Sequence, residues 1–110
     1  MIKRHYEKII KIKNEIQAKP EYKYNLEKLA LKTGVSTNHF CRLYKNITGE
    51  TVFTYLNKIR VEQAKELLIK TNWSIETIAY KTGFDNTPYF YRQFKKNTSM
   101  TPNDFRQQFE

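Results

Sequence analysis

Side chains suited to hydrogen bonding with a nucleic acid share one face of a short segment near the middle of this 110-residue chain. Asn38, Cys41, Arg42 and Lys45 occupy positions i, i+3, i+4 and i+7, which lie together on one side of a helix. An arginine fork can pair with a guanine edge and an asparagine amide with an adenine edge, whereas lysine more often contacts phosphate. The spacing therefore favours recognition over catalysis.

The same pattern returns near the C-terminus. The segment FCRLYK at 40–45 reappears as FYRQFK at 90–95, and LEKLALKTG at 26–34 reappears as IETIAYKTG at 75–83. Two copies are too few for a solenoid, so a duplicated functional unit is the simpler interpretation. The candidate contacts of the two copies are Thr37, Asn38, Cys41, Arg42, Lys45, Thr87, Pro88, Tyr91, Arg92, Lys95 and Lys96.

Each assignment has a simpler alternative. Arg42 and Arg92 could be solvated surface residues, but their equivalent positions in the two copies favour a role in base reading. The lysines are either phosphate contacts or charges that confer solubility. Cys41 lies on the face predicted to be exposed. Its small side chain either touches a thymine methyl group or makes no contact and only leaves space beside the DNA.

Other kinds of site find little support. His5 and His39 have no second ligand at a metal-binding spacing, so no metal site is predicted. No catalytic constellation and no phosphate-binding glycine loop stands out, so we expect neither an enzyme nor a cofactor. The aromatic residues, 15% of the chain, fall mostly on predicted core stripes, which makes base stacking on single strands a minor alternative.

Helical periodicity supplies the elements that would hold these residues. A first helix runs from the N-terminus until Pro20, and Asn25 can cap a short helix at 26–33 that ends at Gly34. Ser36 can cap the next helix, which carries the apolar stripe Phe40, Leu43, Tyr44 and Ile47.

The second half continues in the same way. A long central helix is predicted at 51–70, with one stripe formed by Val52, Tyr55, Leu56, Ile59, Ala64, Leu67 and Leu68. Ser74 can cap a helix at 75–82 closed by Gly83, Pro88 opens a helix to about residue 97, and Thr101 with Pro102 starts a last short helix. The expected fold is thus all-α, with seven helices.

Each copy predicts a helix-turn-helix. Two helices that meet closely need a small residue in the first, and the turn needs a residue that tolerates positive φ. Ala30 with Gly34, and Ala79 with Gly83, supply both at one spacing. The chain is expected to form one domain, with the first helix-turn-helix at about 25–48, a linker helix at about 51–70 and the second at about 74–98.

Composition agrees with a polyanionic partner. Twenty lysines and arginines against eleven acidic residues give a formal charge of +9, although a basic membrane-surface protein would have the same sign. The single cysteine excludes an internal disulfide framework, and the opening residues contain neither a signal-peptide core nor a membrane span. We expect a cytoplasmic protein with no membrane association.

The chain resembles a known family, the AraC/XylS transcription regulators. The similarity covers roughly residues 5–106 and is densest in RVEQA at 60–64, TGFD at 82–85, YF at 89–90, FKK at 94–96 and TP at 101–102. The resemblance implies seven helices, a linker helix, and recognition helices in two successive segments of the major groove on one face of DNA. It places base contacts at Asn38, Cys41, Arg42, Thr87, Pro88 and Arg92.

Three residues depart from the family pattern. Ser99 stands where a glycine matching Gly49 is usual, His39 replaces the aromatic residue matched by Tyr89, and Pro88 offers no side-chain donor. Base reading by the second unit is therefore expected to depend mostly on Arg92.

These features predict a sequence-specific regulator of transcription that binds duplex DNA, with RNA polymerase as the expected protein partner. The alternative is a helical protein-interaction adaptor that kept the fold without specific DNA binding. The chain is either a small stand-alone regulator or the C-terminal part of a longer regulator with a sensing domain. Its charged, linker-like start favours the longer regulator. The operator, the inducer and the direction of regulation do not follow from the sequence.

One molecule is expected to act as a monomer. Both units lie in one chain, and a helix at 51–70 would be roughly 30 Å long, close to the 34 Å repeat of B-DNA. This predicts an asymmetric site whose halves lie about one helical turn apart.

Overall fold

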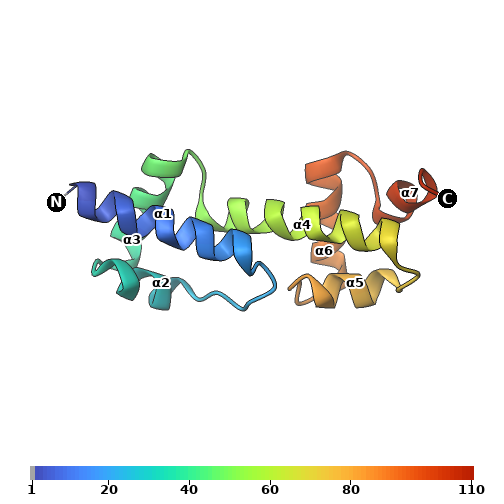
Figure 1. The fold of residues 1–110 in the computed structure, drawn as a ribbon, viewed down its shortest axis with the longest axis horizontal. Helices are drawn as coiled ribbons and strands as arrows, with labels where there is room; N and C mark the ends of the chain where they lie inside the picture. Colours follow the sequence, from blue (N-terminus) through green and yellow to red (C-terminus); the bar gives the residue numbers. More distant parts are fainter. Residues whose placement is uncertain (1) are drawn as a thin grey trace. The chain divides into compact units, whose positions relative to one another are not determined.

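The computed structural model describes residues 2–110 and contains within them seven helices and no strand (Figure 1). The predicted all-α fold is confirmed. The helices are α1 (Ile2–Ala18), α2 (Leu26–Thr33), α3 (Thr37–Thr48), α4 (Val52–Lys70), α5 (Ile75–Lys81), α6 (Thr87–Thr98) and α7 (Pro102–Gln107).

Local hydrogen bonds set the ends of α2 and α3. The Asn25 side chain accepts from the backbone N–H of Lys28, and the Ser36 hydroxyl accepts from that of His39, so both predicted N-caps are confirmed. Gly34, between the two helices, has φ 75° and donates its N–H to the carbonyls of Ala30 and Leu31. This left-handed residue ends α2 and allows the chain to turn directly into α3.

The second copy has similar helix caps and a similar turn, with small differences. The hydroxyl of Ser74 caps α5, and the side chain of Asn86, which was not predicted as a cap, accepts from the N–H of Tyr89 at the start of α6. The helix α5 ends at Lys81, one residue earlier than predicted. Thr82 is the C-cap of this helix, its buried hydroxyl donates to the Ile78 and Ala79 carbonyls, and Gly83 takes φ 102°.

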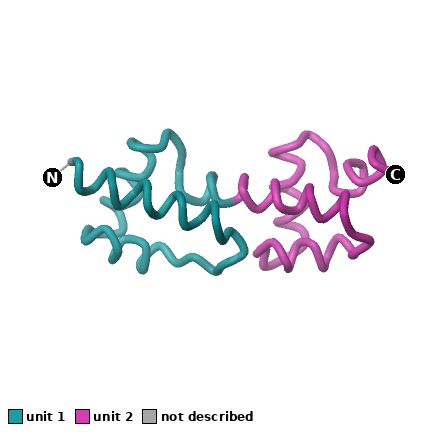
Figure 2. The backbone as a smooth tube through the Cα atoms, in the orientation of Figure 1, with its two compact units in different colours: residues 1–56 teal, residues 57–110 magenta. Residues whose placement is uncertain are grey.

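The chain divides into two compact units at Leu56 and Asn57, within α4 (Figure 2). In unit 1, α1 packs on both α2 and α3. Its buried side chains include Ile9, Ile12 and Ile16 of α1, Leu29 and Ala30 of α2, and Phe40 and Tyr44 of α3. In unit 2 one core cluster combines Val61, Ala64, Leu68, Ile75, Ile78, Ala79, Phe84, Phe90, Phe94 and Phe105.

The helix α4 contributes to both cores, which the predicted single stripe did not describe. Val52, Tyr55 and Leu56 are buried in the first unit, whereas Val61, Ala64 and Leu68 are buried in the second. Two polar residues of α4, Asn57 and Arg60, are buried as well, while the predicted stripe members Ile59 and Leu67 are only half-buried. A single stripe is wrong here because the two halves of the helix contribute to different cores.

The last turn of α4 is held by α7. The Arg106 guanidinium donates through Nε to the Leu68 carbonyl at 3.1 Å and through its terminal nitrogen to the Thr71 carbonyl at 3.3 Å. A cation that bonds the free carbonyls at a helix C-terminus stabilises that end of the helix.

Ser99 occupies the left-handed conformation that its position in the repeat demands. Its φ is 64°, and it is the only non-glycine residue with positive φ among those that the structure describes. Gly49, its counterpart after α3, has φ 91°, and a Cβ added there would meet no atom within 4 Å. Both residues donate a backbone N–H to the carbonyl four residues earlier, so the two helices end alike.

We expect opposite stability changes at these two positions. Ser99→Gly should raise the free energy of unfolding by about 0.5–1 kcal/mol, because it removes left-handed strain at a small cost in unfolded-chain entropy. Gly49→Ala should lower it by about 1 kcal/mol, through backbone conformation alone. Urea unfolding followed by circular dichroism measures both. A stabilising Gly49→Ala or a destabilising Ser99→Gly would contradict this account.

Candidate nucleic-acid interface

The core fixes which face of α3 meets solvent. Phe40 and Tyr44 are fully buried on one side of the helix. Asn38, Arg42 and Lys45 are exposed on the other side, together with Cys41, a free and exposed thiol. The structure thus brings these four predicted residues onto one accessible face, and Thr37 is half-buried at the first position of the helix.

The helix α6 is oriented in the same way within its own unit. Phe90 and Phe94 are fully buried, while Pro88, Arg92, Lys95 and Lys96 are exposed and Thr87 is half-buried. Tyr91 departs from its predicted place on the exposed face. It is half-buried because it packs against the unit 2 core, where its ring meets that of Phe90 at a centroid distance of 6.2 Å.

Tyr44 shows how fully the inner face of α3 is committed to the core. Burial, together with the nearby Tyr55 and Glu50, raises the pKa of its hydroxyl well above the usual value, so the group stays neutral. Among the described residues this hydroxyl is buried without a hydrogen-bond partner. The inner face therefore serves packing, and polar recognition is left to the outer face.

An aromatic ring lies under the exposed arginine of α6. The Arg92 guanidinium carbon is 5.6 Å from the centroid of the Tyr89 ring, within the range of a cation–π contact. The Tyr89 hydroxyl accepts a 2.8 Å hydrogen bond from the side-chain nitrogen of Asn57, which is 7% exposed. A buried residue of α4 is thereby linked to the exposed face of α6.

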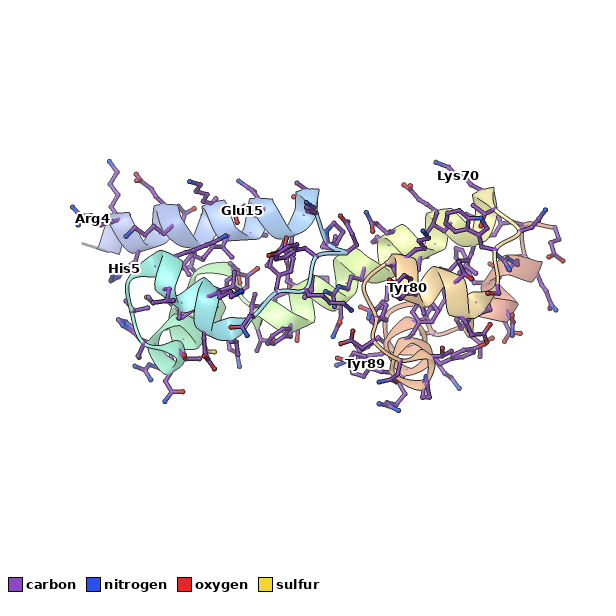
Figure 3. The ribbon with its side chains drawn as sticks, turned by 90° about the horizontal axis from the view of Figure 1, so that it is seen from below. Arg4, His5, Glu15, Lys70, Tyr80 and Tyr89 are labelled. Carbon is purple, nitrogen blue, oxygen red and sulfur yellow. The ribbon has the colours of Figure 1, made fainter. Side chains whose placement is uncertain are left out.

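The two histidines lie side by side although they are 34 positions apart in the sequence. The ring of His5, which lies on α1 (Figure 3), meets the ring of His39 of α3 edge to face, with centroids 5.8 Å apart. No group of three or more potential metal-ligating residues occurs in the part of the chain that the structure describes. The pair therefore offers a contact between two helices of unit 1.

Sequence reasoning missed Asn57, Tyr89 and Asn86 as residues that shape this surface. Asn57 could have been noticed, because it lies four residues before Val61 just as His5 lies four residues before Ile9. The buried residues that follow have the same spacing in both helices, namely Ile9, Ile12 and Ile16 in α1 and Val61, Ala64 and Leu68 in α4. The duplication therefore includes the first helix of each unit, in addition to the repeated segments at 26–45 and 75–95.

Within residues 2–110, no helix has the length and apolar character needed to cross a membrane.

Comparison with known proteins identifies the relatives of this chain. A family described as "Helix-turn-helix domain" matches residues 29–108. The bifunctional transcriptional activator/DNA repair enzyme AdaA of Bacillus subtilis is 45% identical over 85 residues, which are 77% of this chain and 40% of that protein. The regulatory protein PocR of Salmonella typhimurium is 34% identical over 104 residues, 94% of this chain and 34% of that protein. The chain thus spans half or less of the length of the curated relatives it matches.

Solved structures agree with the fold. The C-terminal domain of AraT, a response regulator from Geobacillus stearothermophilus, has a TM-score of 0.81 and 32% identity, over 92% of this chain and 84% of that one. An AraC-type transcriptional regulator from Chromobacterium violaceum has a TM-score of 0.75 and 26% identity, over 96% of this chain and 91% of that one. Both similarities cover more than nine tenths of the chain.

The family resemblance inferred from the repeated segments is therefore confirmed by independent matches in sequence and in fold, and the chain belongs to the AraC/XylS family of helix-turn-helix domains.

Proposed function

We propose that this chain binds duplex DNA in a sequence-specific manner and regulates transcription, with α3 and α6 as its recognition helices. The observation that carries the proposal is the repeated placement of Arg42 and Arg92. Both arginines are exposed at equivalent positions of the repeat, on the side of the helix opposite two fully buried aromatic residues. An exposed arginine in the first half of a helix that enters the major groove can reach a guanine edge.

Charge and flanking residues support the same function. The chain carries a formal charge of +9, and Lys45, Lys95 and Lys96 lie exposed beside the arginines, where they can contact phosphates. Asn38 can pair with adenine, and Cys41 is accessible to a thymine methyl group. Thr37, Thr87, Pro88 and Tyr91 complete the proposed contact surface at the starts and flanks of the two helices.

The proposed partners follow from this function. RNA polymerase is the expected protein partner of a transcription regulator, the chain is expected to bind DNA as a monomer, and its expected compartment is the cytoplasm, where bacterial DNA lies. The relatives are mostly named as regulators, and AdaA is also named as a DNA repair enzyme. Since this chain matches 40% of AdaA, we propose DNA binding and no catalysis for it.

Replacing either arginine with alanine should reduce sequence discrimination. Arg42→Ala or Arg92→Ala should each weaken binding to a duplex selected from a random pool by about 1–3 kcal/mol, because one bidentate contact to a base is lost. Binding to random duplex should change far less. Fluorescence anisotropy on both duplexes measures the difference. Equal losses on the two would assign the arginines to phosphate contact, and failure to select any preferred duplex would favour the adaptor alternative.

Salt should weaken binding in proportion to the phosphates contacted. If about six basic side chains displace counterions, log K should fall against log salt concentration with a slope of about −5. Lys45→Ala or Lys95→Ala should each reduce the magnitude of that slope by roughly one. Lys70→Ala is the matched control, because Lys70 is exposed at the end of α4 and pairs with Glu66 at 3.8 Å. A parent slope near zero would rule out the phosphate contacts.

One protein molecule should occupy one selected site, because both recognition helices belong to a single chain. Light scattering of the complex should give the mass of one chain plus one duplex, and base preferences along the site need not form a palindrome. Two chains per duplex, or a palindromic selected sequence, would show that the reader is a dimer.

A further inference from the structure

The residue at the third position of each recognition helix is in contact with the first helix of its own unit. In unit 1 this residue is His39, whose ring meets that of His5 of α1. In unit 2 it is Tyr89, whose hydroxyl accepts a 2.8 Å hydrogen bond from Asn57 of α4. His5 and Asn57 are equivalent in the duplication, because each lies four residues before the first of three buried core residues. The same contact has therefore been built twice from different side chains.

In unit 2 this contact reaches the base-reading residue directly. Tyr89 is half-buried, with its ring 6.0 Å from that of Phe84 and 5.6 Å from the Arg92 guanidinium. Asn57 is 7% exposed, and its part-buried 2.8 Å hydrogen bond to the Tyr89 hydroxyl restrains the orientation of the ring. A fixed ring under an exposed guanidinium limits the directions that the arginine can take.

We infer that Asn57 and Tyr89 are positioning residues that determine the sequence specificity of Arg92. Asn57 orients the Tyr89 ring through the hydroxyl, and the ring holds the guanidinium in the direction needed for a bidentate contact with a base. An arginine restrained before binding loses less side-chain entropy when it pairs, which favours the matching base over others. The inference rests on the proposed role of Arg92 in DNA recognition.

Because of Pro88, base reading by unit 2 depends more on the orientation of its arginine than base reading by unit 1 does. The position before Tyr89 carries no side-chain donor, whereas its counterpart Asn38 in unit 1 carries an amide. Base reading by α6 thus depends on fewer groups, and the orientation of Arg92 accounts for more of it.

Substitutions at Tyr89 separate the roles of the ring and the hydroxyl. Tyr89→Leu removes the ring, Tyr89→Phe keeps the ring and removes the bond to Asn57, and Asn57→Ala removes that bond from the other side. Tyr80→Leu is the matched control, because Tyr80 is 75% exposed on α5 (Figure 3). Each variant of the 110-residue chain is tested on the duplex selected by the parent and on duplexes changed at single base pairs. The base pair read by Arg92 is the one whose preference is lost in Arg92→Ala.

We expect Tyr89→Leu to reduce discrimination at that base pair by about tenfold and Tyr89→Phe or Asn57→Ala by about threefold, with affinity for random duplex within twofold of the parent. Tyr80→Leu should keep the parent discrimination. Proton NMR of the free protein provides a second readout. The Arg92 Hδ protons should show a ring-current shift in the parent and in Tyr89→Phe that is absent in Tyr89→Leu.

The outcomes distinguish this inference from the proposed function. Parent-like discrimination in Tyr89→Leu, together with loss in Arg92→Ala, would overturn the positioning role and leave base reading by Arg92 intact. Unchanged discrimination in Arg92→Ala itself would overturn base reading by this residue. A uniform loss at every base pair in Tyr89→Leu would show that Tyr89 only stabilises the unit, which also overturns the inference. Thermal unfolding of each variant confirms that it is folded at the assay temperature.

Discussion

Burial of two aromatic residues on one side of each recognition helix is the constraint on which the rest of the molecule depends. Phe40 and Tyr44 in α3, and Phe90 and Phe94 in α6, are fully buried. Because these pairs are four residues apart, each defines one face of its helix and leaves the opposite face to solvent. Polar residues such as Arg42 and Arg92 are thereby exposed at equivalent positions of both units.

The turn before each recognition helix makes that burial possible. Ala30 and Ala79 are buried at equivalent positions, and the glycines that follow adopt φ 75° and 102°. In both turns the residue after the glycine donates its N–H back to the alanine carbonyl, at 3.4 Å from Val35 and at 2.9 Å from Phe84. A small residue permits close helix approach, and a left-handed residue redirects the chain within a few bonds.

The two duplicated units share the same helix arrangement but differ in some of the side chains that stabilise it. The last residues of α3 and α6 are equivalent threonines, since the hydroxyls of Thr48 and Thr98 each donate to the carbonyls of the residue four positions earlier and the residue two positions later. The contact between the first helix and the recognition helix is also shared, yet one unit uses two imidazoles and the other an amide and a phenol. The two units therefore connect these helices by different chemistry.

The sequence by itself determined the helices, the caps at Asn25, Ser36 and Ser74, the left-handed turns, and the exposed face that carries Asn38, Cys41 and Arg42. These features depend on residues close together in the chain, where helical period and turn chemistry are decisive. Tertiary structure alone decided the features that join distant segments: the burial of Asn57 and Arg60 in α4, the hydrogen bond from Asn57 to Tyr89, the pairing of His5 with His39, and the packing of Tyr91 against the core. A polar residue in a helix is expected at the surface unless a partner from another helix satisfies it, and no local pattern shows where that partner lies.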